Sequence, residues 1–145
     1  MVDILIDTNI LVYIFGGHPT YLNFSRTLIE KTPGISIVTY IEMLTGARDD
    51  AEEIKMRKFL AYFEVLPLDI TIADEIARWM RQKKRKSLRD PRFGDTVIAK
   101  TALLHNIPVV TNNPKDFAIF KGLEIMVPEN PVRPPPLSLE FLLKQ

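Results

Sequence analysis

Short apolar runs alternate along this chain with longer segments whose apolar residues recur at helical spacing. The first run, 2–6, is too short for a helix and rich in β-branched residues, so it predicts a buried strand. Further strands are predicted over 35–38, 65–68, 108–110 and 123–127. Strands that alternate with helices imply a parallel sheet covered on both faces. The sequence therefore predicts an α/β fold, with three α/β/α layers around a central, mainly parallel sheet of four to five strands.

The segments between these runs begin and end at residues typical of helix termini. Asp7, Thr8 and Asn9 favour a helix start, and a helix is predicted over 10–15. Further helices are predicted over 21–31, from Thr39, over 50–63 and 69–86, from Asp95 to His105 and over 114–120. We expect one domain over 1–127. Residues 128–145 are interpreted as a Pro-rich linker with a short apolar tail that packs on the domain or across a dimer.

The composition restricts the chemistry that the chain can perform. Its 145 residues suffice for one domain, and 46% of them are hydrophobic, which is enough for a core. No apolar run reaches the ~18 residues of a membrane span, and the N-terminus lacks the features of a signal peptide, so we expect a cytoplasmic protein. There is no cysteine and there are only two histidines. Disulfides, thiolate metal sites and cysteine nucleophiles are therefore excluded.

Four acidic residues fall at or near the carboxyl ends of predicted strands. Asp7 ends the first strand, and Glu42 lies one helical turn past the second. Asp95 opens the helix that leads into the fourth strand, and Asp116 follows that strand by a few residues. In open parallel α/β sheets, sites form at this edge. We therefore expect the four carboxylates to lie near one another.

Carboxylates that are brought together repel one another, and some of them would have to take up protons. A divalent cation removes that conflict, and Mg²⁺ and Mn²⁺ prefer oxygen ligands. A bound cation lowers the pKa of a coordinated water, orients that water for attack and neutralises charge on a phosphate. The grouping therefore predicts metal-dependent hydrolysis of phosphodiester bonds, with no histidine needed as acid or base.

Each acidic residue also has a simpler explanation. Asp7 and Asp95 stand where helices are predicted to begin, so each would serve as an N-cap. Asp116 would serve as a turn residue beside Pro114. Glu42 would be an exposed helical residue, although its neighbours are apolar and a charge buried among them is costly without a partner. Only the shared position of the four residues in one topology favours a joint role.

Four segments of the chain resemble the PIN domain, and within it the VapC-type toxins of bacterial and archaeal toxin–antitoxin pairs. They are ILIDTN (4–9), SIVTYIEML (36–44), DTVIAKTA (95–102) and VVTNNPKDF (109–117), and the resemblance covers about residues 2–127. It implies Mg²⁺- or Mn²⁺-dependent endoribonuclease activity. The family's four acidic positions fall on Asp7, Glu42, Asp95 and Asp116. Asn9 and Thr111 match polar positions that would orient the carboxylates or the bound water.

The resemblance also implies partners. Toxins of this kind are usually dimers, are held inactive by a small antitoxin whose tail enters the acidic groove, and cleave tRNA or ribosomal RNA. We therefore expect a homodimer, a VapB-like antitoxin as partner and an RNA substrate of these classes. Two departures from the family pattern are Lys100, where a small residue is usual, and the extra residues 128–145.

A run of basic residues precedes Asp95. Between residues 78 and 92 there are eight lysines and arginines and one acidic residue, Asp90. We expect this stretch to contact RNA phosphates beside the site. The alternative is a solvated helix end, which the helix dipole favours. The residues with this predicted role are Lys83, Lys84, Arg85 and Lys86.

Two other classes of protein stay open at this point. A non-catalytic PIN-like RNA-binding module would be expected to lack one or more of the acidic residues, and all four are present. A receiver or phosphoryl-transfer domain would use Asp7 as its nucleophile. Asn9 stands where such a domain has a second acidic residue, and no lysine directly follows a late strand. The sequence therefore favours a metal-dependent ribonuclease.

Overall fold

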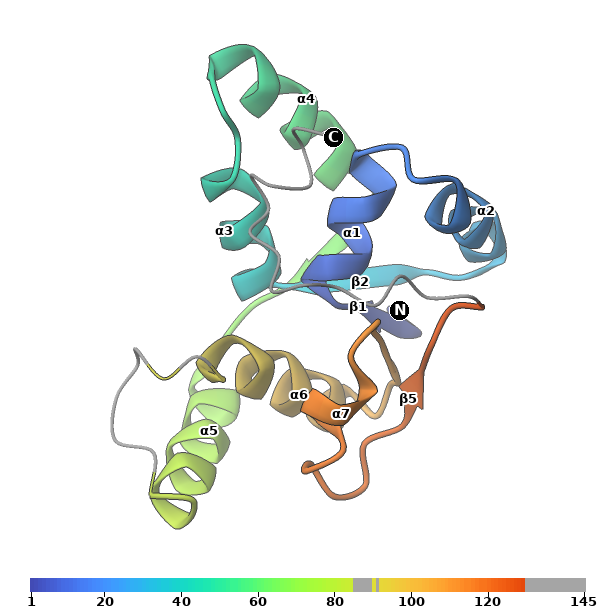
Figure 1. Ribbon diagram of the computed structural model, residues 1–145. Helices are drawn as coiled ribbons and strands as arrows, with labels where there is room; N and C mark the ends of the chain where they lie inside the picture. The colour runs from blue at the N-terminus through green and yellow to red at the C-terminus, as the bar shows by residue number, and fades with distance from the viewer. Residues whose placement is uncertain (85–89, 91, 130–145) are drawn as a thin grey trace.

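A five-stranded parallel sheet forms the centre of the computed structural model, which describes residues 1–84, 90 and 92–129 (Figure 1). The strand order is β3-β2-β1-β4-β5, and every neighbouring pair is parallel. The predicted α/β fold is confirmed, with a sheet that is wholly parallel. The strands are β1 (Ile4–Ile6), β2 (Pro33–Ser36), β3 (Glu64–Leu66), β4 (Val109–Val110) and β5 (Ile125–Met126).

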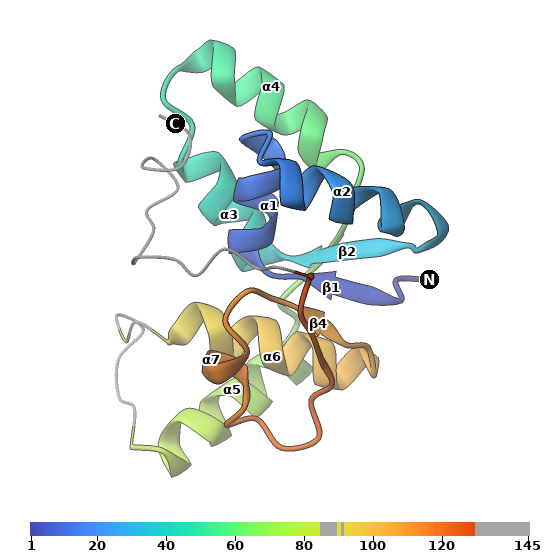
Figure 2. The same cartoon turned by 45° about the vertical axis from the view of Figure 1, so that its right-hand side comes forward.

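Helices cover both faces of this sheet (Figures 1 and 2). One face carries α1 (Thr8–Phe15), α2 (Pro19–Thr27), α3 (Ile37–Thr45) and α4 (Asp50–Leu60), with a short 3₁₀ turn (Leu28–Glu30) after α2. The other face carries α5 (Ile70–Gln82), α6 (Phe93–His105) and α7 (Pro114–Phe117). Within the described residues, no helix is both long and apolar enough to cross a membrane.

Two hydrophobic cores lie on opposite sides of the sheet, because successive side chains of a strand point to opposite faces. Leu5 and Val109 belong to a core with residues of α5, α6 and α7. Ile4, Ile6 and Val110 belong to a second core with residues of α1, α2, α3 and α4. Burial on both faces explains why β1 and β4 appear in the sequence as unbroken apolar runs.

The second predicted strand ends earlier than the sequence indicates. Ile37 and Val38 were predicted to lie in the strand but form the first turn of α3. The cause is Ser36, whose Oγ accepts from the backbone N–H of Thr39 at 3.2 Å and so caps the helix. β-branched side chains favour strands only weakly, and this cap outweighs them.

Other predicted boundaries are also corrected by the structure. Helix α6 begins at Phe93, so Asp95 is its third residue and does not open it. Helix α5 ends at Gln82 and does not reach residue 86; Lys84 has a left-handed backbone with φ of 57°. Residues 85 and 86, and the predicted linker and tail beyond residue 129, lie outside the described residues.

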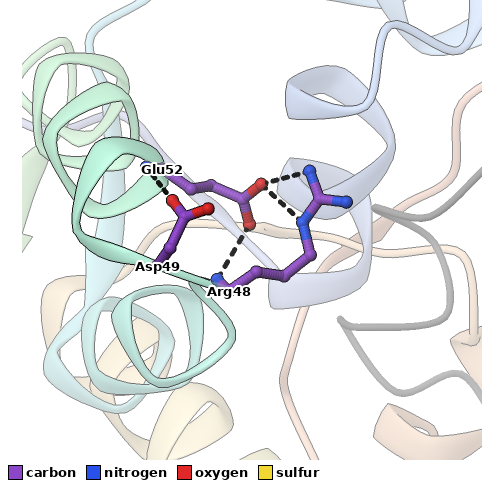
Figure 3. A network of polar contacts seen from close by, with 3 residues as sticks. All are labelled: Arg48, Asp49 and Glu52. Carbon is purple, nitrogen blue, oxygen red and sulfur yellow. Dashed lines mark hydrogen bonds and ion pairs between the residues drawn. The ribbon is translucent and has the colours of Figure 1, made fainter.

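A polar network fixes the connection between α3 and α4 (Figure 3). Asp49 caps α4, because its Oδ1 accepts from the backbone N–H of Glu52 at 2.8 Å. The buried Glu52 carboxylate accepts from the Arg48 backbone N–H at 3.2 Å and from two guanidinium nitrogens at 2.8 and 2.6 Å. A buried carboxylate with this many donors is satisfied within the fold. We therefore assign Glu52 a structural role.

Candidate active site

Asp7 and Thr111 lie side by side where β1 and β4 end. The Asp7 backbone N–H donates to the Val110 carbonyl at 2.9 Å, which extends the strand pairing. The Thr111 hydroxyl donates to Asp7 Oδ2 at 2.7 Å, and Asp7 Oδ1 accepts from the Thr8 N–H at 2.8 Å. Both residues are buried, with 5% of Asp7 and none of Thr111 exposed. Helix capping therefore accounts for only one of the two Asp7 oxygens.

Thr8 connects this pair to Glu42 on α3. Its hydroxyl donates to Glu42 Oε1 at 3.1 Å and lies 3.0 Å from the hydroxyl oxygen of Thr39. Glu42 as a whole residue is exposed, whereas its carboxyl end lies against Thr8 in the site. Neither Thr8 nor Thr39 was predicted from the sequence to be a site residue. The available signal was the spacing of Thr39 and Glu42, which places both on one face of α3.

Asp95 approaches from the opposite side of the sheet, in the first turn of α6. The preceding residue, Gly94, faces α3: a Cβ at this position would make ordinary contacts, 3.5 Å from Val38 Cγ1 and 3.8 Å from Glu42 Oε1. No side-chain hydrogen bond caps α6. The alternative that Asp95 serves only as a helix cap is therefore contradicted.

Asp116 and Asn9 have less defined surroundings. Asp116 is exposed in α7, a few residues past β4. Asn9 lies in the first turn of α1, two residues after Asp7, and its Oδ1 is buried with no hydrogen-bond partner within the described residues. A buried acceptor without a donor is costly. An atom of this kind suits a cation or a water bound to one.

Burial raises the pKa values of three carboxyl groups at this edge, and neighbouring charges add to the rise for two of them. Burial is the main cause that raises the pKa of Asp7 to about 6, and the charges of Glu42 and Asp116 raise it further against the effect of its two hydrogen bonds. The pKa of Asp95 is raised to about 7, first by burial and then by the charges of the other three residues. Burial of its carboxyl group also raises the pKa of Glu42. The structure thus brings the four predicted acidic residues into one electrostatic unit.

The donor atoms fit a hard divalent cation that keeps much of its water. Among residues 1–84, 90 and 92–129, no group of three or more histidine or acidic side chains is placed to hold an ion by itself. Mg²⁺ commonly binds through one or two carboxylates and completes its shell with water and substrate oxygens. The carboxylates fit that mode of binding, whereas a cage with three or more direct protein ligands would require them to move closer together.

The site lies on an open edge of the molecule. Glu42 and Asp116 are exposed, Asp95 is half-buried and Asp7 is buried behind them. Two surface hollows beside α2 are lined by other residues and contain none of these carboxylates. An edge with two exposed carboxylates is accessible to a large substrate.

Basic residues lie beyond the acidic edge. Lys83 and Lys84 are exposed just past the end of α5, and Arg85 and Lys86 lie outside the described residues. Arg92, at the N-cap position of α6, is exposed, and its charge partly opposes the rise in the Asp95 pKa that burial and the other carboxylates cause. Arg92 belongs to the basic run that the sequence predicted to contact RNA, but its effect on Asp95 was not predicted.

Comparison with known proteins gives the class of the fold and site. The profile of the PIN domain matches residues 4–122, and this chain belongs to the PIN domain family. Ribonuclease VapC1 of Methanocaldococcus jannaschii is 33% identical over 127 residues, which cover 84% of this chain and 85% of that protein. Ribonuclease VapC10 of Mycobacterium tuberculosis is 30% identical over 122 residues, which cover 83% of this chain and 90% of that protein. The resemblance predicted from the sequence is confirmed.

Solved structures of toxin–antitoxin complexes share the fold. A chain of VapBC2 from Rickettsia felis, bound to a DNA fragment from their promoter, superposes with a TM-score of 0.70 at 25% identity and covers 89% of this chain and 100% of that chain. A toxin–antitoxin complex from Klebsiella pneumoniae gives a TM-score of 0.69 at 28% identity, over 86% and 96% of the two chains.

Proposed function

We propose that this protein is a metal-dependent endoribonuclease that hydrolyses RNA phosphodiester bonds. The observation that carries the proposal is the electrostatic unit formed by Asp7, Glu42, Asp95 and Asp116 at the carboxyl edge of the sheet. Burial first, and then repulsion by neighbouring carboxylates, raises the pKa values of Asp7 and Asp95, and a bound cation would stabilise their charged forms. The relatives named ribonuclease VapC match more than four fifths of this chain and support RNA as the substrate.

Mg²⁺ or Mn²⁺ would be held directly by Asp7 and Asp95, with Glu42 and Asp116 acting through coordinated water or as further ligands. Such an ion, when bound, supplies an activated water and neutralises charge on the scissile phosphate. The Thr111 hydroxyl holds the Asp7 carboxylate in one orientation. Asp7 and Asp95 must lose their protons before they bind the ion, so we expect binding to release protons near neutral pH.

The cellular role that we infer is that of the toxin in a VapBC-type pair. The support is the set of relatives with VapC names and the solved VapBC complexes with the same fold. On this proposal the protein is cytoplasmic, forms a homodimer, binds a VapB-like antitoxin and cleaves RNA of the tRNA or ribosomal RNA class. The antitoxin would block the same acidic edge that binds the substrate.

Two alternatives predicted different structures. A receiver domain has the strand order 2-1-3-4-5, and the order here places β3 outside β2, so the topology contradicts that alternative. A non-catalytic RNA-binding module has no need of carboxylates with raised pKa values, and three are present here. The ribonuclease therefore remains the better supported function.

The test is cleavage of RNA by the full chain with Mg²⁺ or Mn²⁺, with EDTA, and after Asp7→Asn. We expect cleavage with either ion, and none with EDTA or with the variant. Asp74→Asn, on the exposed side of α5, is the matched control and should cleave like the wild type. Cleavage that survives both EDTA and Asp7→Asn would overturn the proposal. RNA binding without cleavage under every condition would support the non-catalytic alternative.

A further inference from the structure

Tyr21 is a fully buried residue of α2 whose hydroxyl group reaches the loop after β4. The hydroxyl donates to Asn112 Oδ1 at 2.6 Å, and the two residues are 91 positions apart in the chain. Tyr21 has no exposed surface, and Asn112 is 7% exposed. This buried hydrogen bond therefore ties the N-terminal half of the protein to the loop that contains Thr111.

Neighbouring rings hold the Tyr21 side chain in place. It stacks on Tyr13 of α1, with ring centroids 4.6 Å apart and planes 13° from parallel. The His18 ring contacts both tyrosines edge-on, at centroid distances of 5.4 Å from Tyr13 and 5.3 Å from Tyr21. Aromatic contacts of this geometry add to the burial of the rings. The Tyr21 hydroxyl therefore has little freedom to move away from Asn112.

Asn112 stands next to the residue that orients Asp7. The Thr111 hydroxyl donates to Asp7 Oδ2 at 2.7 Å and accepts from the Asn113 backbone N–H at 3.0 Å. The amide Nδ2 of Asn112 is buried and has no hydrogen-bond partner within the described residues. Tyr21 therefore makes the polar contact that fixes this side chain, and loss of its hydroxyl would leave both polar atoms of the amide group unsatisfied.

We propose that Tyr21 is a positioning residue for the active site. Its hydrogen bond to Asn112 holds the loop 111–113 so that the Thr111 hydroxyl keeps Asp7 in one orientation. This role rests on the proposed ribonuclease function for its effect on turnover, but the hold on the loop is a property of the fold. Partners that orient a metal-binding carboxylate contribute about 10- to 100-fold to activity or metal affinity.

The kinetic test compares Tyr21→Phe with Tyr13→Phe. Both variants remove one hydroxyl from the same stacked pair, but no side-chain hydrogen bond of Tyr13 is present within the described residues, which makes it the matched control. We expect Tyr21→Phe to lower kcat for RNA cleavage about 10-fold with KM nearly unchanged. Tyr13→Phe should leave both constants near wild type. Equal losses of kcat in the two variants would mean that both hydroxyls act only through the packing of the ring pair, and would overturn the proposal.

A double-variant cycle tests whether the hydrogen bond itself is the cause. Asn112→Leu removes the acceptor at similar volume, and we expect it to lower kcat as much as Tyr21→Phe does. The double variant should have a kcat no lower than either single variant, because each substitution breaks the same Tyr21–Asn112 hydrogen bond. It also replaces both partners by apolar groups, which should protect folding. Losses that simply add would overturn the proposal.

Hydrogen exchange at the Asn113 amide tests the hold on the loop without any catalysis. This N–H donates to Thr111, so its protection reports on the loop. We expect exchange about 10-fold faster in Tyr21→Phe and unchanged in Tyr13→Phe. Unchanged exchange in Tyr21→Phe would overturn the positioning role. If the wild type cleaved no RNA while Asn113 exchange responded as expected, the proposed function would fail and the hold on the loop would stand.

Discussion

At the scale of single residues, the raised pKa values of Asp7 and Asp95 predict that their charged forms destabilise the fold when no cation is bound. The Asp95 carboxyl group has no hydrogen-bond partner within the described residues, and burial and neighbouring charges raise its pKa to about 7. Asp7 is more buried but has two donors, and its pKa rises less, to about 6. Both carboxyl groups therefore change protonation state near neutral pH.

The first prediction concerns stability and pH. A carboxyl group whose pKa is higher in the folded than in the unfolded state binds protons more tightly when folded, so its contribution destabilises the fold as pH rises from about 4 to 7. Without divalent cations, we expect Asp95→Asn to raise the free energy of unfolding at pH 7.5 by about 1–3 kcal/mol and to flatten its pH dependence.

Urea unfolding at pH 5 and pH 7.5 checks this prediction. The matched control is Asp74→Asn, which removes one exposed charge on α5 away from the site. If Asp95→Asn were less stable than the wild type at pH 7.5, the fold would accommodate the Asp95 charge well, and the raised pKa would be contradicted.

At the scale of helices and strands, the order of elements was predictable and some boundaries were not. Short, mainly apolar runs predicted all five strands of the sheet, most clearly β1 and β4, whose residues are all buried. Helix α6 ends at His105 as predicted, and Asn106 closes it with a left-handed backbone, φ 55°. The cap by Ser36 was missed because Ile37 and Val38 continue the apolar run into the helix. Whether Ile37 and Val38 continue the strand or begin the helix depends on where the chain turns away from the sheet, which the local sequence does not specify.

Two glycines give an opposed pair of predictions at this scale. A Cβ on Gly34 in β2 would lie 2.6 Å from Val2 Cγ1, so Gly34→Ala should cost about 1–3 kcal/mol of folding free energy. At Gly94 the nearest atoms would be 3.5 Å away, and alanine favours a helix over glycine, so Gly94→Ala should be neutral or stabilising by up to about 1 kcal/mol.

Thermal and urea unfolding of both glycine variants measure these effects. Val2→Ala removes the two closest atoms and should recover much of the stability that Gly34→Ala removes, although the Glu64 carbonyl at 3.2 Å remains. Equal stability of Gly34→Ala and the wild type would mean that β1 and β2 pack less closely than these distances indicate.

At the scale of the whole molecule, the fold assembles a site from segments that are distant in the chain. The grouping of the four acidic residues could be predicted because topology places the carboxyl ends of parallel strands at one edge. The contacts that orient them could not, since they join residues 34 to 104 positions apart, as in Thr8–Glu42 and Thr111–Asp7. No local pattern encodes such pairs, and they depend on how helices pack on the sheet.

The basic end of α5, Lys83 and Lys84, supplies a prediction about the substrate. We expect Lys83→Glu with Lys84→Glu to weaken RNA binding and to reduce the slope of log affinity against log salt by about one for each phosphate that is no longer neutralised. Lys55→Glu with Lys58→Glu is the matched control, because these lysines are exposed on α4 across the sheet. Binding measured by fluorescence anisotropy at several salt concentrations, in EDTA, separates affinity from cleavage. Identical slopes in both double variants and the wild type would mean that Lys83 and Lys84 are solvated surface residues that do not contact RNA.

The central claim is that the carboxylates at the end of β1 and in α6 bind a divalent cation, and Mn²⁺ binding followed by electron paramagnetic resonance tests it most directly. We predict that the wild type and Asp74→Asn bind Mn²⁺, that Mg²⁺ competes, and that Asp7→Asn and Asp95→Asn weaken binding by more than about 10-fold. Equal Mn²⁺ binding in the wild type and both site variants, or no binding to the wild type, would contradict this claim.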